Sequence, residues 1–153
     1  MKILMVCLGN ICRSPLAHGI MEHEVKKAGL DWDVDSAGTG NWHVGEPPDR
    51  RSIAVAKNYG IDISSQCCRV FNVKDFDEYD RIYVMDRSNL ADVLRLARND
   101  GDRQKVQLLL KNDIVPDPYY DNALFDPVFV MIEKACKRII ADFSGDPSRS
   151  GTR

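Results

Sequence analysis

The sequence predicts an α/β fold, a three-layer sandwich in which a four-stranded parallel sheet carries helices on both faces. Short runs typical of buried strands alternate along the 153 residues with segments of helical periodicity, and this alternation is typical of a parallel sheet. The first run leads directly into a glycine-containing loop and a helix, and parallel sheets place their binding sites at such carboxyl ends of strands. We expect one domain over residues 1–143, followed by a small, polar, flexible tail over 144–153.

The expected elements follow from local patterns, taken in chain order. Four short runs that end in loops are expected to be strands: residues 2–6, 33–38, 81–85 and 106–110. Helices are expected over 14–28, 49–59, 88–97 and 126–143. Three of them have an expected capping residue, Ser14, Asp49 or Asp126, and the helix over 88–97 opens at Ser88. Prolines suit the first turn of two of them, and glycines suit two helix ends: Pro15, Pro127, Gly29 and Gly60. Residues 61–76 are expected to be irregular, and residues 99–102 to form a turn.

The composition excludes several classes of function. A net charge of −2 at neutral pH offers no basic surface for nucleic acid. No apolar run approaches the ~18–20 residues of a membrane span, so we expect no membrane association. The five cysteines are odd in number and lack the spacing of a disulfide framework. They indicate a reducing compartment, and the cytoplasm is the expected location.

The stretch over residues 6–15, Val-Cys-Leu-Gly-Asn-Ile-Cys-Arg-Ser-Pro, has the properties of a phosphate-binding loop. The residues between Cys7 and Arg13 can curl so that successive backbone N–H groups face one anion. Gly9 and Asn10 tolerate the positive φ angles that such a curl needs. The helix that follows adds a positive terminus, and an arginine can hold two phosphate oxygens at once. These positive surroundings favour the thiolate form of Cys7, which we expect to be a nucleophile; the alternative is a buried cysteine beside a surface charge.

Expulsion of an alkoxide or phenoxide from a phosphate ester requires a proton donor, and Asp117 is the expected general acid. It follows the fourth expected strand and lies between Pro116 and Pro118. The alternative is that this Asp-Pro pair only forms a turn. The adjacent Tyr119 and Tyr120 favour catalysis, because aromatic walls suit a flat, ring-bearing substrate. No metal or organic cofactor is expected, because arginine, backbone amides and a helix terminus already balance the phosphate charge.

These motifs resemble those of the low molecular weight protein tyrosine phosphatases, and the resemblance extends over nearly the whole chain. The loop over 6–15 is that family's signature without a substitution, and Asp-Pro-Tyr-Tyr at 117–120 is similar to its general-acid loop. Further stretches are similar to family blocks: 35–39, 42–45, 47–49 and 85–89. The resemblance implies hydrolysis of phosphotyrosine in proteins or peptides, with inorganic phosphate and similar oxyanions as inhibitors, by a chain that we expect to be a monomer.

The resemblance also implies catalytic roles. Cys7 would be the nucleophile that forms a phosphocysteine, and Arg13 would bind the phosphate. Asp117 would be the general acid in the first step and the general base in the second. The phosphate-binding residues would be Leu8, Gly9, Asn10, Ile11, Cys12, Arg13 and Ser14.

Supporting roles are implied as well. Ser14 would hydrogen-bond the nucleophilic sulfur, and Asp86 would orient Arg13. Asn10 would hold the strained shape of the loop, with Ser36 bonded to it. The pocket for phosphotyrosine would have aromatic walls from Trp42, Tyr119 and Tyr120.

Other cysteines and one substitution add further expectations. In the family, the second cysteine of the loop, Cys12 here, can form a reversible disulfide with the nucleophile; the alternative is a cysteine packed beneath the loop. The remaining cysteines are expected to be structural: Cys67, Cys68 and Cys136. Gln66 stands where the family commonly has a histidine that supports the loop asparagine, and a glutamine can donate and accept to keep that support.

Two other functions fit less of the sequence. Arsenate reductase is similar in fold and loop, but its redox relay needs two further cysteines after the third strand, where residues 83–88 contain none. A phosphotyrosine-binding module without activity would lack Cys7 or Asp117, and both are present. Hydrolysis therefore remains the predicted function.

Overall fold

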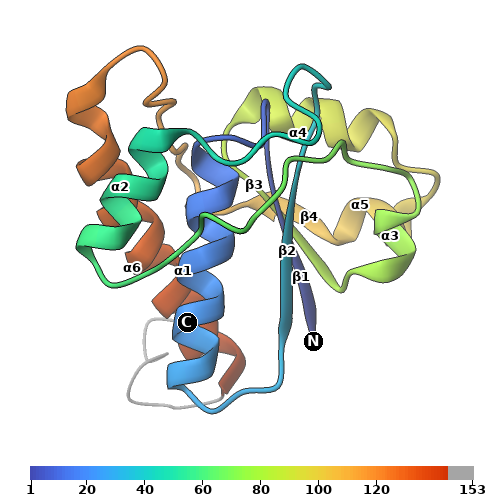
Figure 1. Ribbon diagram of the computed structural model, residues 1–153. Coiled ribbons are helices and arrows are strands. Elements are labelled where there is room, and N and C mark those ends of the chain that lie inside the picture. Colours follow the sequence, from blue (N-terminus) through green and yellow to red (C-terminus); the bar gives the residue numbers. More distant parts are fainter. Residues whose placement is uncertain (145–153) are drawn as a thin grey trace.

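The computed structural model describes residues 1–144, and a parallel sheet of four strands forms its centre (Figure 1). The strands are β1 (Lys2–Cys7), β2 (Asp33–Gly38), β3 (Arg81–Val84) and β4 (Val106–Leu108). They lie in the order β2-β1-β3-β4, and every pair is parallel. The chain passes from β1 to one neighbour and then crosses back to the other, so the topological switch point lies at the end of β1. The tail was expected over residues 144–153, and all of it beyond residue 144 lies outside the described residues.

Helices cover both faces of the sheet, which confirms the predicted fold class. They are α1 (Arg13–Lys27), α2 (Arg50–Asn58), α3 (Asp75–Glu78), α4 (Arg87–Arg95), α5 (Asp100–Gln104) and α6 (Phe125–Ser144), with a 3₁₀ turn η1 (Asn122–Leu124) before α6. Helices α1, α2 and α6 pack together on one face, and α3, α4 and α5 lie on the other (Figure 1). Among the residues described, no helix is both long enough and apolar enough to cross a membrane.

Strand β1 serves the cores on both faces, because successive side chains of a strand point in opposite directions. Ile3 and Met5 join the core beneath α1 and α6, whereas Leu4 and Val6 join the core beneath α4. All four side chains are fully buried. This two-sided burial explains why the run is continuously apolar rather than alternating.

Helix α2 begins and ends as predicted. The carboxylate of Asp49 caps it by accepting a hydrogen bond from the backbone N–H of Arg51 at 2.8 Å. At its end Gly60 has a φ of +81°, which is the left-handed conformation that favours glycine.

Two other predicted caps are wrong. Helix α1 begins at Arg13, so Ser14 lies inside the first turn, and the side chain of its N-cap residue, Cys12, makes no capping hydrogen bond to a described residue. Helix α6 begins at Phe125, so Asp126 also lies inside the first turn. There its carboxylate accepts a hydrogen bond from the hydroxyl of Tyr59 at 2.8 Å. In both cases another hydrogen bond uses the oxygen that local sequence preference assigns to capping, since Ser14 Oγ accepts from the Asn10 side chain at 2.8 Å.

Smaller differences concern element boundaries. The expected turn over 99–102 is the start of α5, because the Asn99 side chain accepts from the N–H of Asp102 at 2.9 Å and so caps a helix. Helix α4 starts at residue 87 rather than 88, because Asp86 is its cap. Strand β3 ends at residue 84 rather than 85, and β4 at 108 rather than 110. Residues 61–76 are irregular up to α3, which begins at residue 75.

Candidate active site

The loop after β1 packs tightly against the end of β2. Cys7 is the last residue of β1 and is 3% exposed. Its carbonyl accepts from the N–H of Thr39 at 3.0 Å, and that of Leu8 accepts from the N–H of Gly40 at 2.9 Å. A Cβ on Gly38 would lie only 2.8 Å from the Leu8 carbonyl oxygen. A glycine at this position therefore lets the loop lie directly against the sheet.

Asn10 takes the left-handed conformation that the curl of the loop requires, with a φ of +57°. Its side-chain amide donates to Ser14 Oγ at 2.8 Å and accepts from the backbone N–H of Arg69 at 3.0 Å. The Cys68 thiol donates to the Asn10 carbonyl at 2.7 Å. Gly9, which the sequence also suggested for a positive φ, does not have one. Asn10 thus fixes the curl of the loop through hydrogen bonds with three partners.

The backbone of the loop keeps its donors unused. Within the described part of the chain, the N–H groups of residues 8–13 donate no hydrogen bond to any other residue. Nearly all such groups in folded proteins have a partner when they are shielded from water. These donors precede the N-terminus of α1, which adds its own positive potential. The loop can therefore bind one anion with several backbone donors.

Ser14 connects the sulfur to the loop. Its Oγ lies 3.0 Å from Cys7 Sγ. Because this hydroxyl accepts from Asn10, its single proton is left for the sulfur or for the Ala37 carbonyl, 3.4 Å away. The hydroxyl proton can therefore stabilise a negative charge on Sγ.

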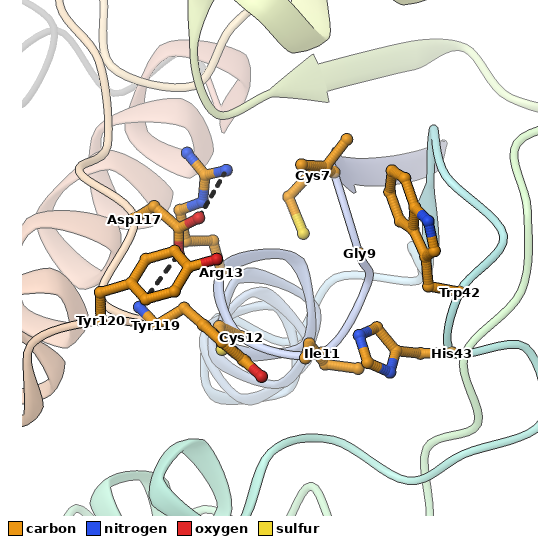
Figure 2. A pocket seen from close by; sticks show the side chains of 11 residues that line it. Cys7, Gly9, Ile11, Cys12, Arg13, Trp42, His43, Asp117, Tyr119 and Tyr120 are labelled. Carbon is orange, nitrogen blue, oxygen red and sulfur yellow. Dashed lines mark hydrogen bonds and ion pairs between the residues drawn. The ribbon is translucent and has the colours of Figure 1, made fainter.

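Arg13 is held on one side and open on the other. It is 3% exposed, and its Nη1 donates to Asp86 Oδ2 at 2.7 Å and to the Val115 carbonyl at 2.9 Å. Its Nη2 lies 4.0 Å from Asp117 Oδ2, and the two groups lie next to each other on one side of the pocket (Figure 2). The expected contact with Asp86 is present. Nε and Nη2 donate no hydrogen bond to another described residue, which leaves them for an oxyanion.

The loop that carries Asp117 is held in place by one arginine. Asp117 Oδ1 accepts from the N–H of Tyr119 at 3.0 Å, and its side chain is 43% exposed. Arg51 Nη1 donates to the Tyr119 carbonyl at 2.9 Å and to Asn122 Oδ1 at 2.7 Å. Asp49 holds the same guanidinium, which lowers the pKa of the Asp49 carboxyl below its usual value. The start of α2 therefore anchors the loop beside the pocket.

These groups surround a pocket of about 310 Å³ (Figure 2). Its lining residues are Cys7, Leu8, Gly9, Ile11, Cys12, Arg13, Trp42, His43, Asp117, Tyr119 and Tyr120. Trp42 lies across Cys7 from Asp117 and the tyrosines (Figure 2). Sequence reasoning did not single out His43, whose Nδ1 lies 2.6 Å from Glu46 Oε2; the signal was its place directly after Trp42.

Two expected supports of the loop are wrong. The Ser36 hydroxyl does not bond to Asn10 but lies 3.1 Å from Nδ1 of His18. Gln66 does not support Asn10 either, because its Nε2 donates to the Pro15 carbonyl at 3.1 Å. Since both polar atoms of the Asn10 side chain already bond to a serine hydroxyl and a backbone N–H, no third partner is needed.

All five cysteines are free thiols. Burial raises the pKa of Cys12 to about 12 and that of Cys68 to about 11, and it also raises the pKa of the fully buried Cys136. Cys67 is exposed. The disulfide between Cys7 and Cys12 stays a prediction. Within residues 1–144 no three His, Cys, Asp or Glu side chains are grouped so that they could hold a metal ion.

Known proteins of similar sequence and structure are phosphatases. The family model for low molecular weight phosphotyrosine protein phosphatase matches residues 2–148. Low molecular weight phosphotyrosine protein phosphatase 2 of Drosophila melanogaster is 40% identical over 149 residues, which are 91% of this chain and 90% of that protein. A protein tyrosine phosphatase from Entamoeba histolytica, with Hepes in its active site, has a TM-score of 0.88 at 35% identity, covering 94% of this chain and 97% of that one. A Drosophila arginine phosphatase also has a TM-score of 0.88, at 34% identity, covering 95% and 99%.

Proposed function

Because the chain belongs to the low molecular weight phosphotyrosine protein phosphatase family, a family of hydrolases, we propose that it hydrolyses phosphotyrosine through a phosphocysteine on Cys7. The observation that supports this most directly is the set of unused N–H groups over residues 8–13, in the loop that directly follows Cys7 and lines the same pocket. Several backbone donors around one thiol suit a phosphoryl group that carries two negative charges. Arg13 would bind two of its oxygens through Nε and Nη2.

In the first step, the Cys7 thiolate attacks phosphorus and the bond from phosphorus to the tyrosine oxygen breaks. The electron pair of that bond goes to the phenolic oxygen, and the proton of a protonated Asp117 goes with it. In the second step, water attacks the phosphocysteine while the Asp117 carboxylate takes a proton from it. Phosphate leaves, and the thiolate returns with the Ser14 hydroxyl donating to its sulfur. The 4.0 Å between Asp117 Oδ2 and Arg13 Nη2 supports this assignment, because a carboxyl this near the proposed phosphate-binding arginine would lie within reach of the leaving oxygen.

The aromatic walls support phosphotyrosine as the substrate. Trp42, Tyr119 and Tyr120 line the pocket, and aromatic side chains pack well against a phenyl ring. The Drosophila arginine phosphatase of similar structure makes phosphoarginine a second candidate substrate. We also propose that the protein acts in the cytoplasm, which its five free thiols support.

Rates of phosphate release from matched peptides test the proposal. Peptides that differ only in phosphotyrosine, phosphoserine or phosphoarginine are compared, with p-nitrophenyl phosphate as a substrate whose leaving group needs little protonation. Wild type should prefer phosphotyrosine, and Cys7→Ser should be inactive on every substrate. Asp117→Asn should lose about 10²–10⁴ in rate on phosphotyrosine and less on p-nitrophenyl phosphate. Asp113→Asn is the matched control, because Asp113 is exposed and, among residues 1–144, its Oδ1 accepts only from the next backbone N–H.

Each outcome of this experiment leads to one conclusion. A preference for phosphoarginine would replace the proposed substrate while keeping the nucleophile. An unimpaired Asp117→Asn on phosphotyrosine would show that another group protonates the leaving oxygen. Consumption of arsenate with thiols, without phosphotyrosine hydrolysis, would overturn the proposed reaction altogether.

A further inference from the structure

A second cavity, of about 320 Å³, lies beside the catalytic pocket. The two share wall residues, because Leu8 and Trp42 line both. The second cavity continues beyond them over Leu96, at the end of α4. It is about as large as the catalytic pocket, whose volume is about 310 Å³. It can therefore take one side chain of a substrate whose phosphotyrosine occupies the first.

Trp42 separates the two cavities and is 67% exposed. Its indole lies directly on the backbone of Gly40, where a Cβ would come within 1.9 Å of the ring. Leu8 and Leu96 are exposed as well, Leu96 by 43%. Exposed apolar side chains that gather at the mouth of a site are typical of an interaction surface. Here that surface begins at the catalytic pocket and extends away from Asp117, since Trp42 lies on the opposite side of Cys7 (Figure 2).

The charges of the second cavity favour an uncharged occupant. Its charged lining residues are Asp92 and Arg95. They pair with each other, with Arg95 Nη1 and Asp92 Oδ1 3.1 Å apart. An acidic or basic side chain would therefore find no unpaired opposite charge there. Phe71 and Leu96 supply apolar wall instead, and burial of apolar surface favours an aliphatic or aromatic side chain.

We infer that the second cavity binds an apolar side chain of the substrate within two residues of the phosphotyrosine, and so gives the enzyme sequence selectivity. The inference rests on the proposed function, because the phosphotyrosine must occupy the catalytic pocket. In an extended peptide, side chains two residues apart point the same way and lie about 6.6 Å apart. That spacing suits two cavities separated by the side chains of Leu8 and Trp42.

This cavity acts on binding and not on the chemical step. An apolar side chain held away from phosphorus contributes equally to the bound substrate and to the transition state, so it lowers KM and leaves kcat unchanged. Burial of most of a leucine side chain corresponds to about a tenfold change in kcat/KM. Phosphotyrosine without flanking residues cannot fill the second cavity, so its kcat/KM should not be raised in this way.

The test compares peptides that carry leucine or serine at each of the four positions from −2 to +2 around phosphotyrosine. For wild type, leucine at one or more of these positions should raise kcat/KM about tenfold through KM. In Leu96→Ser this preference should fall to about twofold or less, and Leu96→Met should keep it. Met131→Ser is the matched control, because Met131 is an exposed apolar residue on α6 and lines neither cavity. It should keep the full preference.

Hydrolysis of p-nitrophenyl phosphate separates this inference from the proposed function. Equal kcat for wild type, Leu96→Ser and Met131→Ser on this substrate shows that all three are folded and active. Equal kcat/KM of wild type for leucine and serine peptides would overturn the inference while leaving the phosphatase intact. A preference that survives in Leu96→Ser would also overturn it. Failure of wild type on every phosphotyrosine substrate would instead overturn the proposed function.

Discussion

Gly38→Ala tests whether the loop is fixed by its contact with β2. Gly38 makes two backbone hydrogen bonds to the segment over residues 69–71, donating to the Arg69 carbonyl at 2.9 Å and accepting from the N–H of Phe71 at 2.7 Å. It therefore cannot retreat from the loop without breaking the bridge between these segments. A new Cβ would lie 2.8 Å from the Leu8 carbonyl oxygen and 3.1 Å from the backbone nitrogen of Asn10. Both atoms belong to backbone, so the loop itself must move.

The size of the effect follows from these distances. The shortest contact is about 0.6 Å below the 3.4 Å at which ordinary contacts begin. A displacement of about 1 Å at a catalytic group costs about 10² in rate, so we expect kcat/KM to fall about tenfold. Overpacking costs about 1–3 kcal/mol of unfolding free energy. Replacing glycine stabilises through the unfolded chain by about 0.4–1 kcal/mol. The net loss of about 1–2 kcal/mol should lower Tm by about 2–8 °C.

Steady-state hydrolysis of p-nitrophenyl phosphate, competitive inhibition by inorganic phosphate and thermal unfolding measure these effects. Both kcat/KM and phosphate affinity should fall, because the displaced backbone carries the N–H donors over residues 8–13. Gly101→Ala is the control, since Gly101 lies within α5 and alanine favours a helix. It should keep full activity with little change in Tm, because the helix preference of alanine is offset by a Cβ 3.2 Å from the Asn99 oxygen that caps α5. Wild-type kinetics in Gly38→Ala would refute the reasoning, because the loop would then tolerate displacement.

Three further predictions concern groups around the pocket. Asp86→Asn keeps a capping side chain for α4 but loses the charge beside Arg13, so kcat/KM should fall about 10–150-fold, equivalent to about 1.5–3 kcal/mol, with little change in Tm. Asp86→Ala removes the cap as well, so its Tm should also fall. A fully active Asp86→Asn would contradict the role of that charge. In Arg51→Lys, the lysine cannot bond to two loop acceptors in a fixed plane. The rate of phosphotyrosine hydrolysis should therefore fall several-fold, while the rate on p-nitrophenyl phosphate, which depends less on Asp117, should not change. An equal fall on both substrates would argue against anchoring of the loop by Arg51. Burial raises the pKa of Cys12 to about 12, so this thiol is protonated at pH 7.5, and iodoacetamide should modify it only after unfolding. Peptide mass mapping measures the modification of Cys12. Rapid modification in the folded protein would contradict the prediction.

The parts of the site that are contiguous in sequence could be predicted from it. Cys7, Arg13 and the residues between them form one loop, so their chemistry can be recognised without knowing the fold. The approach of Asp117 depends on the sheet, yet it could be predicted because parallel strands end at one edge. The contact between Asp86 and Arg13 spans 73 positions and came from a family resemblance rather than from any local pattern.

Other contacts could not be predicted because tertiary partners compete with local preferences. Ser14 has the sequence context of a helix cap, but its hydroxyl bonds to Asn10 and to the Cys7 sulfur. The hydroxyl of Ser36 was expected at Asn10, yet His18 lies in reach on α1. Side chains that can bond in several ways take the partner that the packed helices present, and sequence spacing carries no record of that choice.

Because β1 lies at the centre of the sheet, the two halves of the proposed catalytic site should differ in local stability. Strand β1 has a partner on each side, so its amide protons should exchange with solvent only when the whole domain unfolds. Residues 117–120 lie outside the sheet, and an arginine side chain from α2 anchors them. Their amides should exchange through small local openings. Such openings would let a product leave past Asp117, the proposed acid, while Cys7 and the proposed phosphate-binding loop stay assembled for the next substrate.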